Sequence, residues 1–226
     1  MNGAEAVRII SLLPALLGYH RGFYYSNSKE WYVDISYITG EKIIKKTCRT
    51  ISQVALAKHL EKDDFKFIYI YNMNPLITLP DQARLRKALL KDDIFLVVHE
   101  THWTETTLYA DVVLPATTFL EKKDLVIPYS HNFIRLSNRV IDPIGESKSE
   151  IWVMREIAKR LGIESDIIYE NEMGALKKAL INAIDNGEFE DLLKQKVLKL
   201  RMKPRNKYQT PTGKIEFYSI TALKKE

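Results

Sequence analysis

Cysteine is nearly absent from this sequence, because Cys48 is the single one among 226 residues. A lone thiol cannot form a disulfide framework, nor a metal or iron–sulfur site built from cysteines alone, so we expect a reducing compartment. Glycine and proline are also scarce, at nine and eight residues, which excludes collagen-like and low-complexity chains. Apolar residues make up 46% and charged residues 28%, an ordinary globular composition.

No apolar run is long enough to span a membrane. The longest run, Ile9 to Leu17, is interrupted by Ser11 and Pro14, whereas a transmembrane helix needs about 20 apolar residues. A signal peptide is not expected either, since the bulky residues Tyr19 to Arg21 stand where small cleavage-site residues would be needed. We therefore expect a cytoplasmic protein without a membrane partner.

Several fingerprints of known chemistry are missing. Neither the dinucleotide motif G-x-G-x-x-G nor the phosphate-binding motif G-x-x-x-x-G-K-[ST] occurs. No nucleophile triad can be assembled, so no catalytic residue is predicted. His99 and His102 do not follow the H-E-x-x-H pattern and lack a further His or Cys to complete a shell, so no metal ligand is predicted. The carboxylates Glu121 and Asp124 indicate a solvated loop rather than an acid–base pair.

The positive charge is concentrated in one segment. The formal net charge is +5, yet Lys194 to Lys207 holds seven basic residues and no acidic one, so the rest of the chain is slightly acidic. Such a run can follow a phosphate backbone, with Tyr208 stacking on a base. A basic nucleic-acid-binding or assembly module without redox activity is therefore the alternative interpretation. A solvated helix face followed by a linker explains the run more simply, so we do not expect nucleic acid as a partner.

Strands and helices alternate in the middle of the sequence. Apolar patterns predict strands at 65–71, 94–98 and 111–115, a helix at 80–91 begun by Pro80, and one or two helical turns at 103–110. This alternation predicts the α/β class, with a Rossmann-like domain whose mostly parallel sheet is flanked by helices. Ligands of such sheets bind beyond the carboxyl ends of the strands.

Further elements are expected on both sides of this region. The predicted helices are at 4–17, 51–61, 173–186 and 188–200, and strand-like pieces are at 31–38, 125–127, 133–140 and 210–219. One more helix should begin after the N-cap Ser149 and end at Gly162. Its apolar face is expected to hold Ile151, Met154, Ile157, Ala158 and Leu161.

Polar side chains follow the first two strands of the predicted sheet. Asn72 to Pro75 comes directly after the first strand, and its amides can bind a nucleotide-like ligand. A simple turn, which Asn and Pro favour for conformational reasons, is the better explanation of these residues by themselves. Glu100 ends the second strand, where a carboxylate can accept hydrogen bonds from ribose hydroxyls. Threonine hydroxyls then surround the start of a helical turn, where phosphate is favoured, although N-capping accounts for one of them: Thr101, Thr104, Thr106 and Thr107.

Three stretches in combination resemble a known family. They are YNMNP at 71–75, VVHETHWTETTLYADVVLPATTFLEKKD at 97–124 and RVIDPIGESKSEIWVMREIAKRLG at 139–162. Together they resemble the large subunit of molybdopterin-dependent oxidoreductases of the dimethyl sulfoxide reductase type, which includes formate dehydrogenases. The resemblance runs from about Asn2 to Ser219, and TPTGKIEFYS at 210–219 looks like that family's lead-in to a final β-barrel.

The resemblance implies a cofactor and a set of binding residues. The cofactor is one molybdopterin guanine dinucleotide, held by loops at the carboxyl ends of the strands. By motif position, Asn72, Asn74 and Pro75 would line the site and Glu100 would hold the guanosine ribose. The residues that would approach the pyrophosphate are Thr101, Thr104 and Thr106.

The resemblance also implies what this chain lacks. The family's iron–sulfur region, its metal-ligand domain and its terminal barrel have no counterpart here, and its glycine-rich turn is reduced to Arg21 to Tyr24. We therefore expect the cofactor-binding part of a formate-dehydrogenase-like enzyme, inactive alone. Its Mo or W centre would form only in a complete assembly, with a partner chain that carries the missing domains or with self-association. The expected parts are an N-terminal helical or irregular part at 1–62, a dinucleotide-binding core at 63–165, a helical extension with a basic linker at 166–209 and a lead-in strand at 210–226.

Overall fold

The computed structural model describes residues 3–19, 31–44, 48–63, 65–129, 131–203, 208 and 210–219. The expected turn at 21–24 and the basic residues at 204–207 lie outside this described part of the chain. The chain divides into two compact units. The sheet unit comprises Ser36–Leu125 and Leu136–Ala175, and the terminal unit comprises Met1–Ile35, Val126–Arg135 and Leu176–Glu226.

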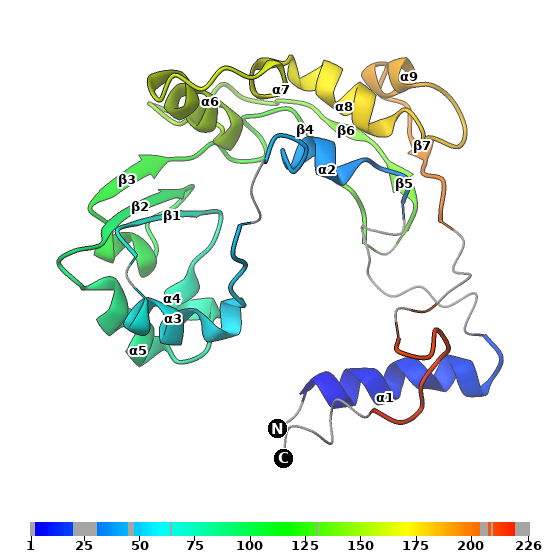
Figure 1. Ribbon diagram of the computed structural model, residues 1–226. Coiled ribbons are helices and arrows are strands. Elements are labelled where there is room, and N and C mark those ends of the chain that lie inside the picture. The colour runs from blue at the N-terminus through cyan, green and yellow to red at the C-terminus, as the bar shows by residue number, and fades with distance from the viewer. Residues whose placement is uncertain are drawn as a thin grey trace. The chain divides into compact units, whose positions relative to one another are not determined.

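A parallel sheet forms the centre of the sheet unit (Figure 1). Its strands are β1 (Phe67–Tyr71), β2 (Phe95–Glu100) and β3 (Val112–Pro115), in the order β1-β2-β3. Tyr69 lies opposite Val97, which in turn lies opposite Val112. The expected α/β class with a parallel sheet is confirmed.

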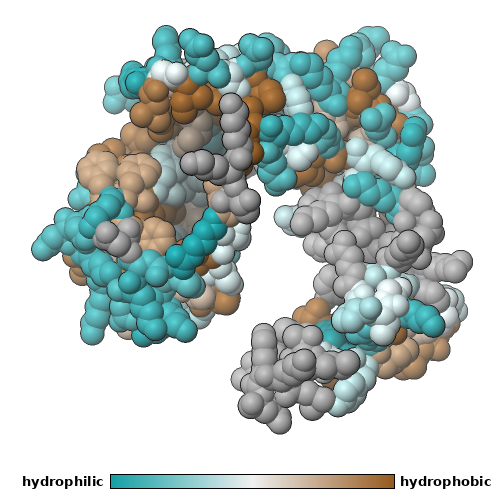
Figure 2. Space-filling model, viewed as in Figure 1, coloured by the Kyte–Doolittle hydropathy of each residue, from teal (hydrophilic) through white to brown (hydrophobic). Residues whose placement is uncertain are grey.

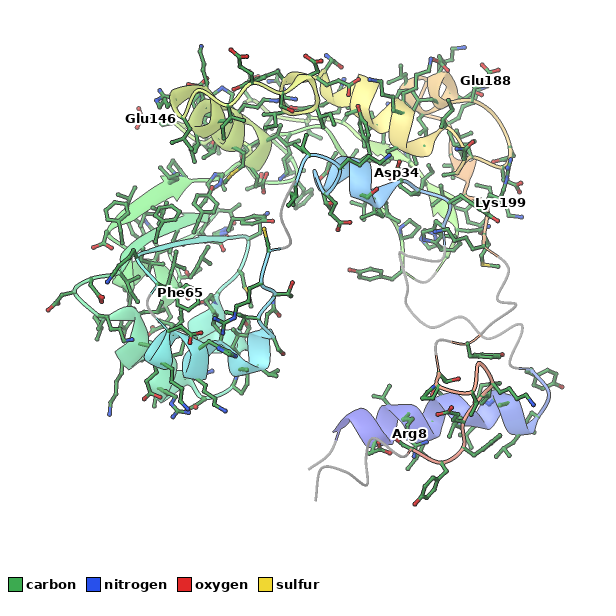
Figure 3. All side chains as sticks on the ribbon, in the orientation of Figure 1. Arg8, Asp34, Phe65, Glu146, Glu188 and Lys199 are labelled. Carbon is green, nitrogen blue, oxygen red and sulfur yellow. The ribbon has the colours of Figure 1, made fainter. Side chains whose placement is uncertain are left out.

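Three helices cover one face of this sheet: α3 (Leu56–Lys62), α4 (Pro75–Thr78) and α5 (Gln82–Leu89). Alternate residues of β2 face them, so Leu96 and Val98 are fully buried in the core. Phe65 packs against the same core (Figure 3). The helices contribute Ala57, Leu60, Leu76, Leu79, Leu85, Ala88 and Leu89.

The opposite face of the sheet is apolar but less well covered. The rings of Phe67 and Phe95 stack at 6.3 Å between centroids, yet these residues are 57% and 49% exposed. Figure 2 shows apolar colour over the strands of this unit, whereas the outer surface of its helices is mostly hydrophilic. Parallel sheets are normally covered on both faces. This face is covered at Val97 and His99, which are buried, and is open where the strands begin, around Phe67 and Phe95.

The sheet unit contains several further elements. They are α2 (Ile35–Ile38), η2 (Gln53–Ala55), η3 (Thr106–Tyr109), β4 (Asp124–Leu125) antiparallel to β6 (Leu136–Ser137), α6 (Glu150–Arg160) and α7 (Asp166–Tyr169). The N-cap of α6 is as expected, because Ser149 Oγ accepts a bond of 3.2 Å from Trp152 N. The expected apolar face is only partly right: Ala158 is buried together with Val153, but Ile151 is 47% exposed.

The terminal unit has its own small core. Its elements are α1 (Gly3–Leu16), most of α8 (Glu172–Leu180), α9 (Phe189–Leu193) and β5 (Phe133–Ile134) antiparallel to β7 (Leu198–Lys199). The most deeply buried side chains here are Ile134, Leu180, Ala183, Leu192 and Leu200. Among the described residues of the whole chain, no helix is both long and apolar enough to cross a bilayer.

Two expected elements of the chain are wrong. The strand expected at 31–38 is replaced by α2 and by a single antiparallel bridge between Trp31 and Met202. The helix expected at 188–200 ends with α9, because Gln195 adopts a φ of +64° and the chain then extends into β7. Leu198 and Leu200 are buried at a spacing of two, which is a strand period rather than a helical one.

Smaller differences concern element boundaries. The helix expected at 80–91 begins at Gln82, because Asp81 has a left-handed φ of +58°. Pro80 was expected in the first turn of this helix, but the proline in a first helical turn is Pro75, in α4. The helix expected at 173–186 ends at Leu180. The described residues 210–219 contain no strand; Gly213, with a φ of +67°, closes a turn there by donating to the carbonyl of Thr210.

Candidate functional site

Four segments of the sheet unit meet where the strands end. Three of them follow β1, β2 and β3, and the fourth lies beside β3 through a parallel bridge between Ala116 and Lys148. Lys148 N donates to the Pro115 carbonyl at 3.0 Å, and Thr117 N donates to the Lys148 carbonyl at 3.2 Å. We call residues 72–75, 100–107, 116–122 and 147–150 the strand-end site.

Asn72 adopts a strained backbone conformation at this site. Its φ of +50° lies in the left-handed region, which asparagine tolerates better than most residues. Its backbone N–H donates to the His99 carbonyl at 3.3 Å, and its Nδ2 donates to Glu150 Oε1 at 2.5 Å. Asn72 is exposed, and its carboxamide is held in place by Glu150, the first residue of α6.

Asn74 and Thr106 join the loops after β1 and β2. Asn74 Oδ1 accepts bonds from the Thr106 hydroxyl at 2.7 Å and from Thr106 N at 3.3 Å. The same hydroxyl accepts a bond from Leu76 N at 3.3 Å, and Pro75 is buried beside it. The two loops that the sequence predicts to form one site are thus in direct contact. Thr106 itself is fully buried and belongs to the scaffold of the site.

Glu100 is half-buried and has one oxygen available. Its Oε1 accepts bonds from Thr101 N at 2.8 Å and from the Thr101 hydroxyl at 3.1 Å. Within the described part of the chain no hydrogen bond uses Oε2. Nearby, Thr104 lies two residues before η3, and its carbonyl accepts a bond from the Thr107 hydroxyl at 2.7 Å. A carboxylate oxygen and short hydroxyl side chains therefore lie along one loop.

His99 is a fully buried scaffold residue. Its Nε2 lies 3.1 Å from the Lys148 carbonyl, which can only accept, so Nε2 carries the proton. Its Nδ1 then accepts from the Tyr69 hydroxyl at 2.9 Å. Burial is the main factor that raises the pKa of Tyr69 to about 12, which keeps this hydroxyl protonated. Both ring nitrogens of His99 are thus engaged, and the described residues contain no group of three or more potential metal ligands.

An ion pair completes the site, and the sequence did not reveal it. Lys122 Nζ lies 3.0 Å and 2.9 Å from the two carboxylate oxygens of Glu150, whose side chain is only 19% exposed. Burial alone would raise the pKa of Glu150, but the hydrogen bonds from Lys122 and Asn72 outweigh it and lower this pKa. The N-cap at Ser149 marks the start of a helix, whereas nothing in the sequence marks this partner.

Glu121 corrects another expectation. It was expected in a solvated loop, but its side chain is buried and accepts bonds from Thr118 N at 2.7 Å and Ile144 N at 2.6 Å. These backbone donors lower the pKa of Glu121. A charged carboxylate therefore ties the loop after β3 to the segment that leads to Lys148.

The donor set of the site fits a polar, phosphate-containing dinucleotide. The hydroxyl of Thr117 is the clearest sign, because it is buried at the end of β3 without a hydrogen-bond partner among the described residues. Buried hydroxyls normally have a partner, so such an atom is suited to a ligand or an ordered water. The Asn72 carboxamide and the free oxygen of Glu100 add groups that suit ribose and base.

Comparison with known proteins matches residues 12–160 to the family model described as molybdopterin oxidoreductase. A Bacillus subtilis protein named Probable oxidoreductase YoaE is 34% identical over 96% of this chain and 34% of its own length. The dimethyl sulfoxide/trimethylamine N-oxide reductase of Rhodobacter capsulatus is 33% identical over 55% of this chain and 15% of its own. The F420-dependent formate dehydrogenase subunit alpha of Methanocaldococcus jannaschii is 36% identical over 44% of this chain and 14% of its own.

A solved structure has the same fold. Acetylene hydratase from Pelobacter acetylenicus superimposes with a TM-score of 0.60 at 22% identity, covering 90% of this chain and 29% of that one. This chain spans about a third of the length of the Bacillus subtilis relative. The resemblance to enzymes of the dimethyl sulfoxide reductase type is confirmed, and the chain belongs to the molybdopterin oxidoreductase family.

Proposed function

We propose that this chain is the cofactor-binding part of a formate-dehydrogenase-like enzyme, and that the strand-end site holds one molybdopterin guanine dinucleotide. Membership of the family implies molybdopterin as the cofactor. The observation that supports the dinucleotide form of this cofactor is the position of Glu100, a carboxylate at the end of β2 with one oxygen that makes no hydrogen bond in the described part of the chain. At this place in a nucleotide-binding sheet, an acidic residue accepts bonds from ribose hydroxyls.

The polar groups of the site have the following roles in this proposal. Glu100 Oε2 accepts from the guanosine ribose, and the hydroxyl of Thr104 donates to the pyrophosphate. The hydroxyl of Thr101 donates to Glu100 Oε1 and so holds this carboxylate beside the cofactor. The Asn72 carboxamide, fixed by Glu150, orients the nucleotide. The hydroxyl of Thr117 is a further donor that the sequence motifs did not indicate.

Binding and orientation are the chain's contribution to the reaction. When bound in a complete assembly, the pterin and its Mo or W centre supply two-electron redox chemistry. The whole enzyme also needs the regions that the longer relatives have and this match does not cover. We therefore propose that the chain alone does not turn over substrate and works with a partner chain in the cytoplasm.

The test is cofactor retention after purification from a molybdenum-competent host. We expect pterin fluorescence in the purified chain, and a loss of about 90% or more in Glu100→Ala, since the loss of one charge-assisted bond weakens binding about tenfold or more. The matched control is Glu164→Ala, which changes an exposed glutamate beyond the far end of α6 and should leave pterin content unchanged. Absence of pterin from the unmodified chain, or equal retention by both variants, would contradict the proposal.

A further inference from the structure

The strand β1 has an open edge. It pairs with β2 on one side, and within the described part of the chain no strand lies on its other side. Two bonds fix which backbone groups face β2: Phe95 N donates to the Lys66 carbonyl at 2.9 Å, and Asn72 N donates to the His99 carbonyl at 3.3 Å. In a parallel ladder, alternate residues bond to the same neighbour. The N–H and C=O groups that point to the open edge therefore belong to Phe67, Tyr69 and Tyr71.

A cavity of about 570 Å³ lies along this edge. Four consecutive residues of β1, Ile68 to Tyr71, line it, although successive side chains point to opposite faces of the sheet. Because residues from both faces of β1 line the cavity, it lies along the edge of this strand and is not confined to one face of the sheet. One wall is made of leucines from the helices that cover the sheet: Leu56, Leu60, Leu85 and Leu89. The rest of the lining is Gln53 together with Asn72, Met73 and Pro75 after β1, so the cavity extends to the strand-end site.

The cavity is continuous with the hydrophobic core of the sheet unit. Ile68 and Ile70 pack against the buried core and also line the cavity. An apolar cavity of roughly 150 Å³ accommodates one small aromatic molecule, so this volume admits several apolar side chains. An added strand would bring such side chains at alternate positions, directly over the walls formed by α3 and α5.

The sequence of β1 has none of the features that prevent another strand from pairing with its open edge. Edge strands of native proteins usually contain a charged residue, a proline or a bulge, which prevents another strand from pairing with them. β1 reads FIYIY, with neither charge nor proline, and its five residues pair with β2 in an unbroken register. The edge is therefore suited to accept a strand.

We propose that the open edge of β1 accepts an extended segment of a partner polypeptide, with alternate apolar side chains that fill the cavity. The partner is the part of the enzyme that the Bacillus subtilis relative has beyond the 34% of its length matched by this chain. This identification rests on the proposed function. Strand binding and pterin retention are measured separately, so either can fail while the other holds.

A second copy of this chain fits the edge less well. Its own β1 could pair edge to edge, but Ile68 and Ile70 of that copy already face their own core. Such a pairing would satisfy backbone groups and leave both cavities unfilled. A strand with free apolar side chains satisfies the edge and the cavity together.

The probes are overlapping synthetic peptides that span the unmatched part of the Bacillus subtilis relative, each about 15 residues long so that it contains a whole strand. Binding is followed by fluorescence anisotropy, and hydrogen exchange locates the contact. We expect one peptide, or adjacent overlapping ones, to bind saturably. The amides of Phe67, Tyr69 and Tyr71 should then exchange at least about tenfold more slowly.

Two matched controls separate strand addition from non-specific apolar binding. N-methylation of the peptide amides that face β1 removes the backbone donors, so its affinity should fall at least about tenfold. Gln53→Trp narrows the cavity mouth and should also weaken binding about tenfold, whereas Lys58→Trp, on an exposed position of α3 outside the lining, should not.

Several results would overturn the proposal. One is that no peptide binds at concentrations up to about 1 mM, the weakest affinity expected for such a contact. Others are that the methylated peptide binds equally well, or that protection appears away from β1. Protection of the β1 amides on raising the concentration of the chain alone would instead identify a second copy as the occupant.

Discussion

Lys122 and Glu150 connect the strand ends at the scale of single residues. Glu150 accepts from Lys122 on both carboxylate oxygens and from Asn72 on one, so a single side chain links three segments of the sheet unit. Asn72 keeps a left-handed backbone in this arrangement. Orientation of its carboxamide therefore depends on the charge of a residue that lies far away in the sequence.

The pH dependence of stability should reveal this pair. The pKa of Glu150 is lowered in the folded chain, so the ionised carboxylate stabilises the fold above the ordinary glutamate pKa of about 4.3. This contribution is lost as pH falls through the lowered pKa. We expect Glu150→Gln to reduce the free energy of unfolding by about 1 kcal/mol at about pH 7 and by almost nothing at about pH 3.

Urea unfolding at the two pH values measures the difference. The control is Glu146→Gln, at an exposed position, which should have little effect at either pH. An unchanged effect of Glu150→Gln across this range would show that the charge of Glu150 does not stabilise the fold.

At the scale of elements, α6 carries Glu150 to its place and depends on its first turn. Ser149 has extended backbone angles and its hydroxyl accepts from Trp152 N, the arrangement of a helix N-cap. Ser165 stands at the same position before α7 but makes no such bond. The two serines therefore form a natural comparison.

Replacement of each serine by alanine should distinguish the effect of the N-cap hydrogen bond from the effect of merely removing a serine hydroxyl before a helix. Ser149→Ala should lower the free energy of unfolding by about 1 kcal/mol, because a backbone N–H loses its partner, whereas Ser165→Ala should change it by less than about 0.5 kcal/mol. Thermal or urea unfolding of the two variants checks this. Equal effects would mean that the Ser149 hydroxyl does not stabilise α6.

These elements also show how far the sequence predicts the structure. The strands of the sheet and the cap at Ser149 were predictable because they depend on local apolar runs and on one capping residue. The segment around Leu198 was misread as helix, because its strand pairs with β5, far away in the sequence. Lys122 and Glu150 are 28 residues apart, and no local sequence pattern predicts that they form an ion pair. The cofactor roles and the expected domain boundaries stay predictions.

At the scale of the whole molecule, exposed aromatic side chains on the sheet face favour association. Phe67 and Phe95 stack on each other but remain about half exposed. Contiguous apolar surface of this kind marks a contact with another protein or with a second copy. The longer relatives have additional chain that could cover such a surface.

We expect the isolated chain to self-associate in a concentration-dependent way. Phe95→Lys places a charge on the sheet face and should weaken this association at least about tenfold, since burial of a phenylalanine contributes about 2 kcal/mol. The control Phe119→Lys changes a residue that is 69% exposed in a loop and should have little effect. Sedimentation velocity over a dilution series measures both. A chain that stays monomeric at every concentration would contradict this expectation.

The order β1-β2-β3 is also the order in which the ribosome makes the strands. Each new strand of this sheet can therefore pair with the one that was made before it, and none of the three has to wait for a distant segment of the chain. Growth of the sheet is directional, and β1 is the first strand to appear. Its free side is consequently exposed from the earliest stage of synthesis, so nascent chains on one messenger RNA would benefit from early capture by a chaperone or by the partner.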